Sequence, residues 1–290
     1  MSEAGAPVRI WFQKHTVEGR LPLLDDAYRL HFAAVARPGT EVVVRTLPEA
    51  AYDTPIPAGF VRYGAVEALF AAHFAAAAWH ADHEGFDAFI VGASQDPGLV
   101  EARALAGIPV LGYGETAFHL AAMTGRSIGV VGFIPELEEP LRENLERFGL
   151  AGRVRAFSYV DTPSDVMVQA LRGEPEPFLA AFTEAADRVV ARGAEVIVPG
   201  EGLPNEVLWA AGIRSHGGAA ILDPDGLVVK AAELLVDMRR LGILGPSSNG
   251  YRSRRPPTDV LAHLVEVFQP SSWTAPPAAP ADPAVPDGER

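Results

Sequence analysis

Short apolar runs alternate with longer stretches of helical periodicity through most of this 290-residue chain. The apolar runs have the length and the β-branched content of buried strands, and the stretches between them repeat apolar residues every three or four positions. This alternation predicts an α/β fold with parallel strands covered by helices on both faces. The predicted strands are residues 8–12, 41–45, 86–92, 109–111, 127–133, 154–159, 195–198 and 219–222.

The strand and helix pattern restarts near residue 127, which indicates two similar lobes. We expect residues 1–118 plus 219–268 to form the N-terminal lobe and residues 119–218 to form the second lobe. Residues 269–290 are rich in proline and alanine and lack periodicity, which is typical of a disordered tail.

Charge and composition exclude several classes of protein. The net charge of −13 argues against nucleic acid as a partner, because phosphate binding needs a concentrated basic face. There is no secretory signal pattern and no apolar stretch long enough to span a bilayer, so we expect a cytoplasmic protein without a membrane partner. The chain has no cysteine, which excludes disulfides, thiolate nucleophiles and thiolate metal sites.

The loops after the predicted strands are the natural place for a ligand. Right-handed connections bring the carboxyl ends of parallel strands to one edge of a sheet, and ligands bind outside that edge. The loops to consider are therefore residues 13–16, 93–98, 113–116, 133–135 and 200–205. No metal or cofactor motif and no Ser-His-Asp order is evident in them.

Glu201 is the first candidate for a catalytic residue. It follows an apolar strand and is flanked by Gly200 and Gly202, which let the backbone approach a ligand closely. A glutamate in this place is either a solvated loop residue or helix cap, or a general acid or base whose pKa an apolar pocket raises.

Asp96 is the second catalytic candidate. An aspartate followed by Pro97 fits the N-cap and the first position of a helix. Alternatively, Ser94, Gln95 and Asp96 lie at a strand end where free backbone N–H groups favour an anionic or carbonyl group of a ligand.

Further residues on these loops are candidates for substrate contacts. Gln13 and His15 follow the first strand, and a histidine there can titrate near neutral pH. Glu115 and Thr116 open a helix, where Glu115 equally complements the helix dipole. The substrate-binding candidates are Gln13, His15, Ser94, Gln95, Glu115, Thr116 and Gly202.

Several segments in this order resemble one family. They include Arg9-Ile10-Trp11-Phe12-Gln13, Asp96-Pro97-Gly98-Leu99 and Gly193-Ala194-Glu195-Val196-Ile197. Together they are similar to the hydantoin racemase branch of the aspartate/glutamate/hydantoin racemase superfamily, over about residues 8–242. The resemblance implies two Rossmann-like lobes related by pseudo-twofold symmetry, a cofactor-free cleft for a small-molecule substrate between them, and a homo-oligomer, a dimer or higher.

The chain departs from this family where the catalytic thiols are expected. The resemblance places the first thiol at Ala93 and the second at Glu201, within one residue of Gly200. Three functions remain open: a racemase that moves a proton without thiols, with Glu201 paired with Asp96 or His15; a lyase or hydrolase with Glu201 as general base; and a small-molecule binding protein without turnover.

Overall fold

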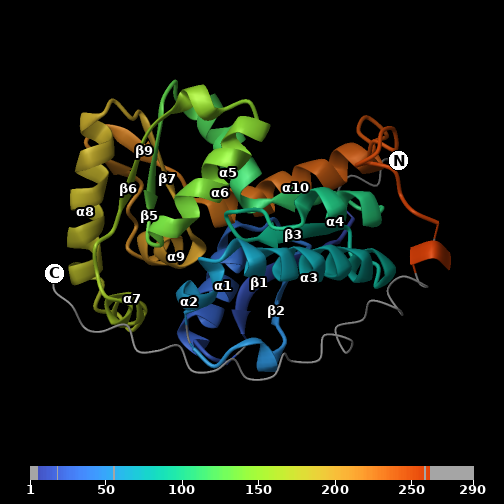
Figure 1. The fold of residues 1–290 in the computed structure, drawn as a ribbon, viewed down its shortest axis with the longest axis horizontal. Helices are drawn as coiled ribbons and strands as arrows, with labels where there is room; N and C mark the ends of the chain where they lie inside the picture. The colour runs from blue at the N-terminus through green and yellow to red at the C-terminus, as the bar shows by residue number, and fades with distance from the viewer. Residues whose placement is uncertain (1–5, 18, 55, 258, 262–290) are drawn as a thin grey trace, which may run out of the picture. The chain divides into compact units, whose positions relative to one another are not determined.

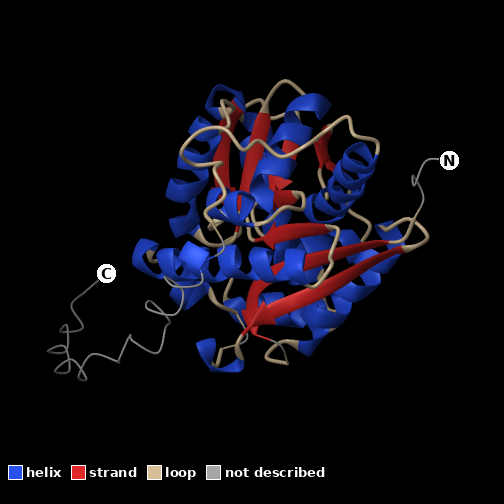
Figure 2. Cartoon of the chain, turned by 90° about the vertical axis from the view of Figure 1, so that its right-hand side faces the viewer, coloured by secondary structure: helices blue, strands red, loops and turns tan. Residues whose placement is uncertain are grey.

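The computed structural model describes residues 6–17, 19–54, 56–257 and 259–261. The chain divides into two compact units, Met1–Arg254 and Arg255–Arg290, and the elements below belong to the first. They form two separate sheets with helices around them, which confirms the predicted α/β class (Figure 1, Figure 2). The predicted tail at 269–290 lies outside the described residues.

The first sheet has the strand order β2-β1-β3-β4, and its three strand pairs are parallel. Successive side chains of the inner strand β1 point to opposite faces of the sheet, each covered by helices. Ile10 and Phe12 pack with α1 and α10, and Trp11 packs with α3 and α4. The elements are β1 (Val8–Val17), α1 (Pro22–Val35), β2 (Thr40–Leu47), η1 (Glu49–Ala51), α2 (Ala58–Val61), α3 (Gly64–His83), β3 (Ala88–Gly92), α4 (Leu99–Leu105), β4 (Val110–Gly112) and α10 (Pro224–Arg240).

The second sheet has the order β6-β5-β7-β9-β8, parallel except for the pair β8–β9. Helices α5 and α6 cover one face, and α7, α8 and α9 contribute to the core on the other. The elements are α5 (Tyr113–Thr124), β5 (Ile128–Gly132), η2 (Pro135–Leu137), α6 (Glu138–Arg147), η3 (Ala151–Arg153), β6 (Val154–Tyr159), α7 (Ser164–Leu171), α8 (Glu176–Ala191), β7 (Val196–Pro199), α9 (Gly202–Ala210), β8 (Ser215–His216) and β9 (Ala219–Ile221).

Two segments differ from the sequence-based expectation. Residues 13–16, expected as a loop, continue β1, because Gln13 and Lys14 still pair with β3. Residues 219–221, expected in the N-terminal lobe, form β9 and pair with β7 of the second sheet, whereas α10 returns to the first sheet. Within the described part of the chain, no helix combines the length and apolar character needed to cross a bilayer.

Candidate active site

One pocket of about 100 Å³ lies where the carboxyl ends of strands from both sheets meet. Most of its lining is apolar, and four of the five expected loops contribute to it; the loop at 113–116 does not. The lining comprises Lys14, His15, Thr16, Leu24, Tyr28, Ile56, Pro57, Val61, Gly92, Ala93, Ser94, Gln95, Phe133, Ile134, Leu137, Glu201, Gly202, Leu203 and Pro204.

Glu201 is the carboxylate of this pocket. It is the N-cap residue of α9, and its side chain turns away from that helix toward the loop after β5. There Oε2 accepts a hydrogen bond from the Phe133 N–H at 2.9 Å, and Oε1 accepts one from the Ile134 N–H at 3.0 Å. Burial raises the pKa of Glu201 to about 7, against the two N–H donors, which lower it. The group is therefore poised to gain or lose a proton near neutral pH.

The glycines on either side of Glu201 are required by close contacts. A Cβ at Gly200 would lie 3.0 Å from the Gly132 Cα, because β5 and β7 are neighbours at this edge. A Cβ at Gly202 would lie 2.2 Å from the Tyr28 hydroxyl oxygen. A side chain at Gly202 would overlap with Tyr28, and one at Gly200 would make a tight contact, so the backbone packs closely on each side of the glutamate.

Across the pocket, the segment after β3 supplies Ala93, Ser94 and Gln95. All three are buried, and the main-chain oxygen of Gln95 accepts a hydrogen bond from Asn144 Nδ2 at 2.6 Å. Ala93 carries no titratable group, so the position where the resemblance places a first thiol has no acid or base. The pocket thus has Glu201 on one side and a methyl group at the matched position on the other.

Asp96 does not line the pocket. The helix that follows it begins at Leu99 with Gly98 as N-cap, so Asp96 does not cap that helix. Its carboxylate instead accepts hydrogen bonds from the N–H groups of Gly114 at 2.9 Å and Glu115 at 2.7 Å, at the start of α5. Burial raises its pKa to about 8, against those two donors. The backbone of Asp96 takes a positive φ of 53°, which aims the side chain at α5.

Three of the predicted substrate contacts also lie away from the pocket. The Gln13 amide accepts a hydrogen bond from Trp11 Nε1 at 3.0 Å and donates one to the Lys14 carbonyl at 3.3 Å. Glu115 forms an ion pair with Arg103, and Thr116 lies in the first turn of α5. Of the other predicted contacts, Ser94, Gln95, His15 and Gly202 line the pocket.

His15 lies in an aromatic environment at the pocket. Its ring centroid is 4.8 Å from that of Phe70 and 5.1 Å from that of Phe74. Burial, with a smaller contribution from His73, lowers the pKa of His15 to about 3. The imidazole is therefore neutral at pH 7 and a weak base.

Three polar residues of the pocket, Lys14, Thr16 and Tyr28, are not among the candidates named from the sequence. Lys14 is 2% exposed and forms an ion pair with Asp25, and its Nζ lies 5.1 Å from the centroid of the Tyr28 ring. Lys14 lies on the loop expected at residues 13–16, and that position marks it as a candidate, whereas nothing in the sequence distinguishes the Tyr28 hydroxyl from that of a core tyrosine.

A buried polar cluster anchors α9, the helix that begins after Glu201. His31 Nδ1 is 2.7 Å from Glu206 and its Nε2 is 2.8 Å from Asp223, and its ring stacks on Trp209 at 4.1 Å. Although burial alone would lower it, hydrogen bonds to Asp223 and Glu206 raise the pKa of His31 to about 10. The cationic imidazole therefore ties α1 to α9 and to the start of α10.

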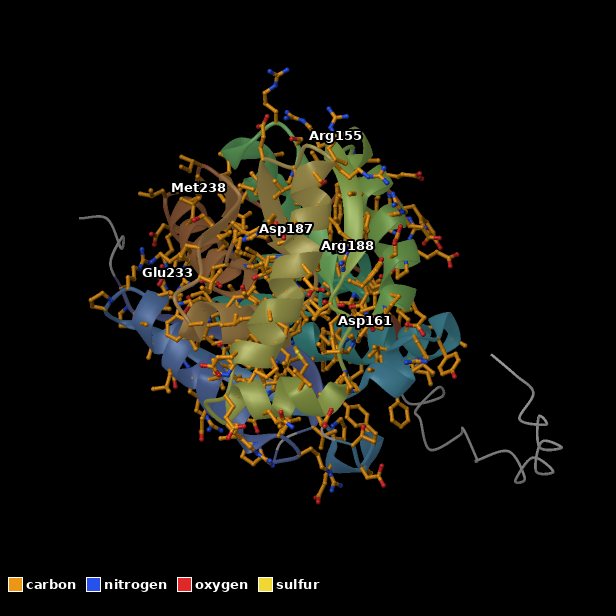
Figure 3. All side chains as sticks on the ribbon, turned by 90° about the vertical axis from the view of Figure 1, so that its left-hand side faces the viewer. Arg155, Asp161, Asp187, Arg188, Glu233 and Met238 are labelled. Atoms are coloured by element: carbon orange, nitrogen blue, oxygen red, sulfur yellow. The ribbon has the colours of Figure 1, made fainter. Side chains whose placement is uncertain are left out.

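The described residues contain no group of three His, Asp or Glu side chains arranged to hold a metal ion, and this includes the His31 cluster. His216 lies outside the pocket and bonds Asp187 of α8 at 2.7 Å. Asp187 and its neighbour Arg188 are seen on the outer helix α8 in Figure 3.

Comparison with known proteins agrees with this architecture. The family model described as Asp/Glu/Hydantoin racemase matches residues 30–232. The chain is 29% identical over 158 residues to a hydantoin racemase of Pseudomonas sp. (strain NS671), covering 54% of this chain and 61% of that protein. It is 27% identical over 167 residues to a hydantoin racemase of Paenarthrobacter aurescens, covering 57% of this chain and 67% of that protein.

Two solved structures share the fold. The allantoin racemase from Klebsiella pneumoniae aligns with a TM-score of 0.66 at 24% identity, over 87% of this chain and 94% of that one. The allantoin racemase from Pseudomonas fluorescens aligns with a TM-score of 0.68 at 23% identity, over 87% and 98%. The chain belongs to the Asp/Glu/Hydantoin racemase family, although it lacks cysteine entirely.

Proposed function

We propose that the protein is a racemase-like enzyme that moves the proton on the carbon next to a carbonyl group. Its substrate is a small amino-acid-derived compound or a cyclic amide of the hydantoin type. The observation that carries this proposal is the Glu201 carboxylate in an apolar pocket, with a pKa raised to about 7 by burial. The names of the relatives support the substrate class.

The proposed step uses Glu201 as the base. Its carboxylate takes the Cα proton of the substrate, and the C–H electron pair moves into the bond toward the carbonyl carbon, whose oxygen becomes negative. The N–H groups of Phe133 and Ile134 fix the carboxylate in one orientation, so no reorganisation is needed before the transfer. Return of the proton from Glu201 to the same face restores the carbonyl group and the starting enantiomer. Inversion requires that water deliver a proton to the opposite face of the planar intermediate, because Ala93 has no proton to give.

A second candidate function follows from Ala93. Racemisation by two bases needs an acid on the face opposite Glu201, and the alanine provides none. A site with a single acid/base residue suits a lyase or hydrolase in which Glu201 acts as general base on water or on the substrate. A binding protein without turnover is the third alternative, and the experiment below separates all three.

The test incubates the protein in deuterium oxide with single enantiomers of 5-substituted hydantoins, allantoin and amino acids. We expect deuterium at Cα and loss of enantiomeric excess with at least one of them. Glu201→Gln should reduce this rate about 10²–10⁴-fold, the usual contribution of a general base. The exposed Glu184 of α8 gives a matched control, because Glu184→Gln makes the same chemical change in the same lobe.

The other outcomes each assign a different function. A product of changed mass that requires Glu201 would establish the lyase or hydrolase. Ligand-dependent thermal stabilisation with neither exchange nor a new product would establish a binding protein. Exchange that survives Glu201→Gln would refute the role proposed for this residue.

A further inference from the structure

Tyr28 presents a hydroxyl group to the same pocket as Glu201. The residue is 5% exposed and belongs to the pocket lining. Its ring is fixed by Phe12 at 5.6 Å, Phe32 at 5.5 Å and the Lys14 ammonium above it. Among the described residues, these contacts involve the ring, and none is a hydrogen bond to the hydroxyl group.

The Tyr28 hydroxyl is not fully enclosed, in contrast to the buried, unpartnered hydroxyl of Tyr113, so it can donate a hydrogen bond to a group in the pocket. The packing that holds Tyr28 explains where its oxygen points. The oxygen lies against the backbone of Gly202, where a Cβ would approach to 2.2 Å. Gly202 directly follows Glu201 and is itself part of the pocket lining, so the phenol oxygen and the base are held at the same helix start.

Proton removal next to a carbonyl group creates a negative oxygen, and a fixed donor at that oxygen lowers the barrier. From this arrangement we propose that Tyr28 is a further catalytic residue, whose hydroxyl donates a hydrogen bond to the carbonyl oxygen of the substrate as Glu201 takes the Cα proton. The inference rests on the proposed function of Glu201. No proton leaves Tyr28. The carbonyl oxygen of the substrate accepts the electron pair and the hydrogen bond from Tyr28, and the pair returns to Cα when Cα is reprotonated.

The surroundings of Tyr28 favour a donor over a base. Burial, then the charges of Asp225, Glu206 and Asp25, raises its pKa, so the phenol keeps its proton across the neutral range. Lys14, with its Nζ 5.1 Å from the ring centroid, is itself paired with Asp25, so it helps to hold the Tyr28 ring without adding an unpaired charge.

Tyr113 provides a matched control for this role. Both tyrosines are buried residues, but the Tyr113 hydroxyl is fully enclosed without a partner and the residue is not part of the pocket lining. Tyr28→Phe and Tyr113→Phe therefore remove the same atom from similar surroundings, and neither change breaks a hydrogen bond. Both variants should fold with nearly unchanged melting temperature, which makes a kinetic difference interpretable.

The experiment measures deuterium exchange into a 5-substituted hydantoin such as 5-isopropylhydantoin. For Tyr28→Phe we expect kcat to fall about 10²–10³-fold, the effect of losing one oxyanion donor, with KM changed less than about threefold. Tyr113→Phe should match the wild type. If Tyr28→Phe keeps wild-type kcat while Glu201→Gln is inactive, the role of Tyr28 is refuted and that of Glu201 stands.

A binding measurement decides the case without turnover. The planar compound 5-isopropylidenehydantoin resembles the enolate at its ring carbon, and calorimetry gives its Kd. We expect Tyr28→Phe to weaken binding about three- to tenfold, the effect of losing one hydrogen bond to a neutral carbonyl oxygen, and Tyr113→Phe to leave it unchanged. Equal affinities in the two variants would refute the contact. If the wild-type protein neither binds this compound nor catalyses the exchange, the proposed function itself is refuted.

Discussion

Ala93 and Glu201 line one pocket from the carboxyl edges of two different sheets. Ala93 follows β3 of the first sheet and Glu201 follows β7 of the second, at the two positions where the family resemblance places thiols. The glutamate keeps a titratable group on one side, and the alanine removes it on the other. Any chemistry in this pocket therefore begins from an asymmetric arrangement.

The titration of Glu201 predicts how activity depends on pH. The base must be ionised, and its pKa is raised to about 7, so kcat/KM should fall about tenfold per unit as pH drops below 7 and level off above it. Initial rates of Cα deuterium exchange between pH 5 and 9 measure this profile. A plateau that extends below pH 6 would contradict the assignment of Glu201 as the base.

Replacement of Ala93 by cysteine should restore the missing side of the site. The change adds one sulfur atom at the pocket and supplies an acid opposite Glu201, so racemisation should rise about tenfold or more. Chiral chromatography of a hydantoin substrate measures the rate. Ala72→Cys on the exposed face of α3 adds a thiol away from the pocket and should have no effect. An unchanged rate with a demonstrably reduced thiol at position 93 would count against the matched geometry.

His15 predicts a loss of stability in acid. Its pKa is about 3 in the folded protein and 6.5 in the unfolded chain, so the unfolded state binds the proton first as pH falls. The contribution of the neutral His15 imidazole to the free energy of unfolding is complete above about pH 6.5. It is lost as the pH falls toward 3, at up to about 1.4 kcal/mol per pH unit. His15→Phe should therefore reduce the difference in urea unfolding free energy between pH 7.5 and pH 5.

The control for this prediction is His119→Phe, because His119 is exposed on α5. Its pH dependence of unfolding should equal that of the wild type. An identical pH dependence for His15→Phe would show that the imidazole is not held neutral by its aromatic neighbours.

The contact between Gly202 and Tyr28 can be tested by a double-mutant cycle. A Cβ at Gly202 would clash with the Tyr28 hydroxyl at 2.2 Å, so Gly202→Ala should cost about 1–3 kcal/mol of unfolding free energy. Tyr28→Phe removes the clashing oxygen and should recover about 1 kcal/mol in the double variant. Gly152→Ala is the control, since a Cβ there meets nothing within 4 Å. Additive effects would show that the two residues are not in contact.

The sequence determined the α/β class, the two parallel-dominated sheets and most helices, because strand and helix periods are local properties that one-dimensional patterns record. It also located Ala93 and Glu201 on loops after strands. It misassigned residues 13–16 and 219–221, since the length of β1 and the pairing of β9 depend on partner strands.

Only the tertiary structure decided which side chains share the pocket. Asp96 turns to the start of α5, Gln13 is held by Trp11, and the Tyr28 hydroxyl meets the backbone beside Glu201. Each of these contacts joins segments through a side-chain direction that packing selects among several rotamers. The sequence therefore set where the loops and the base lie along the chain, and the packing of α1, α5 and α9 set which polar atoms face the substrate.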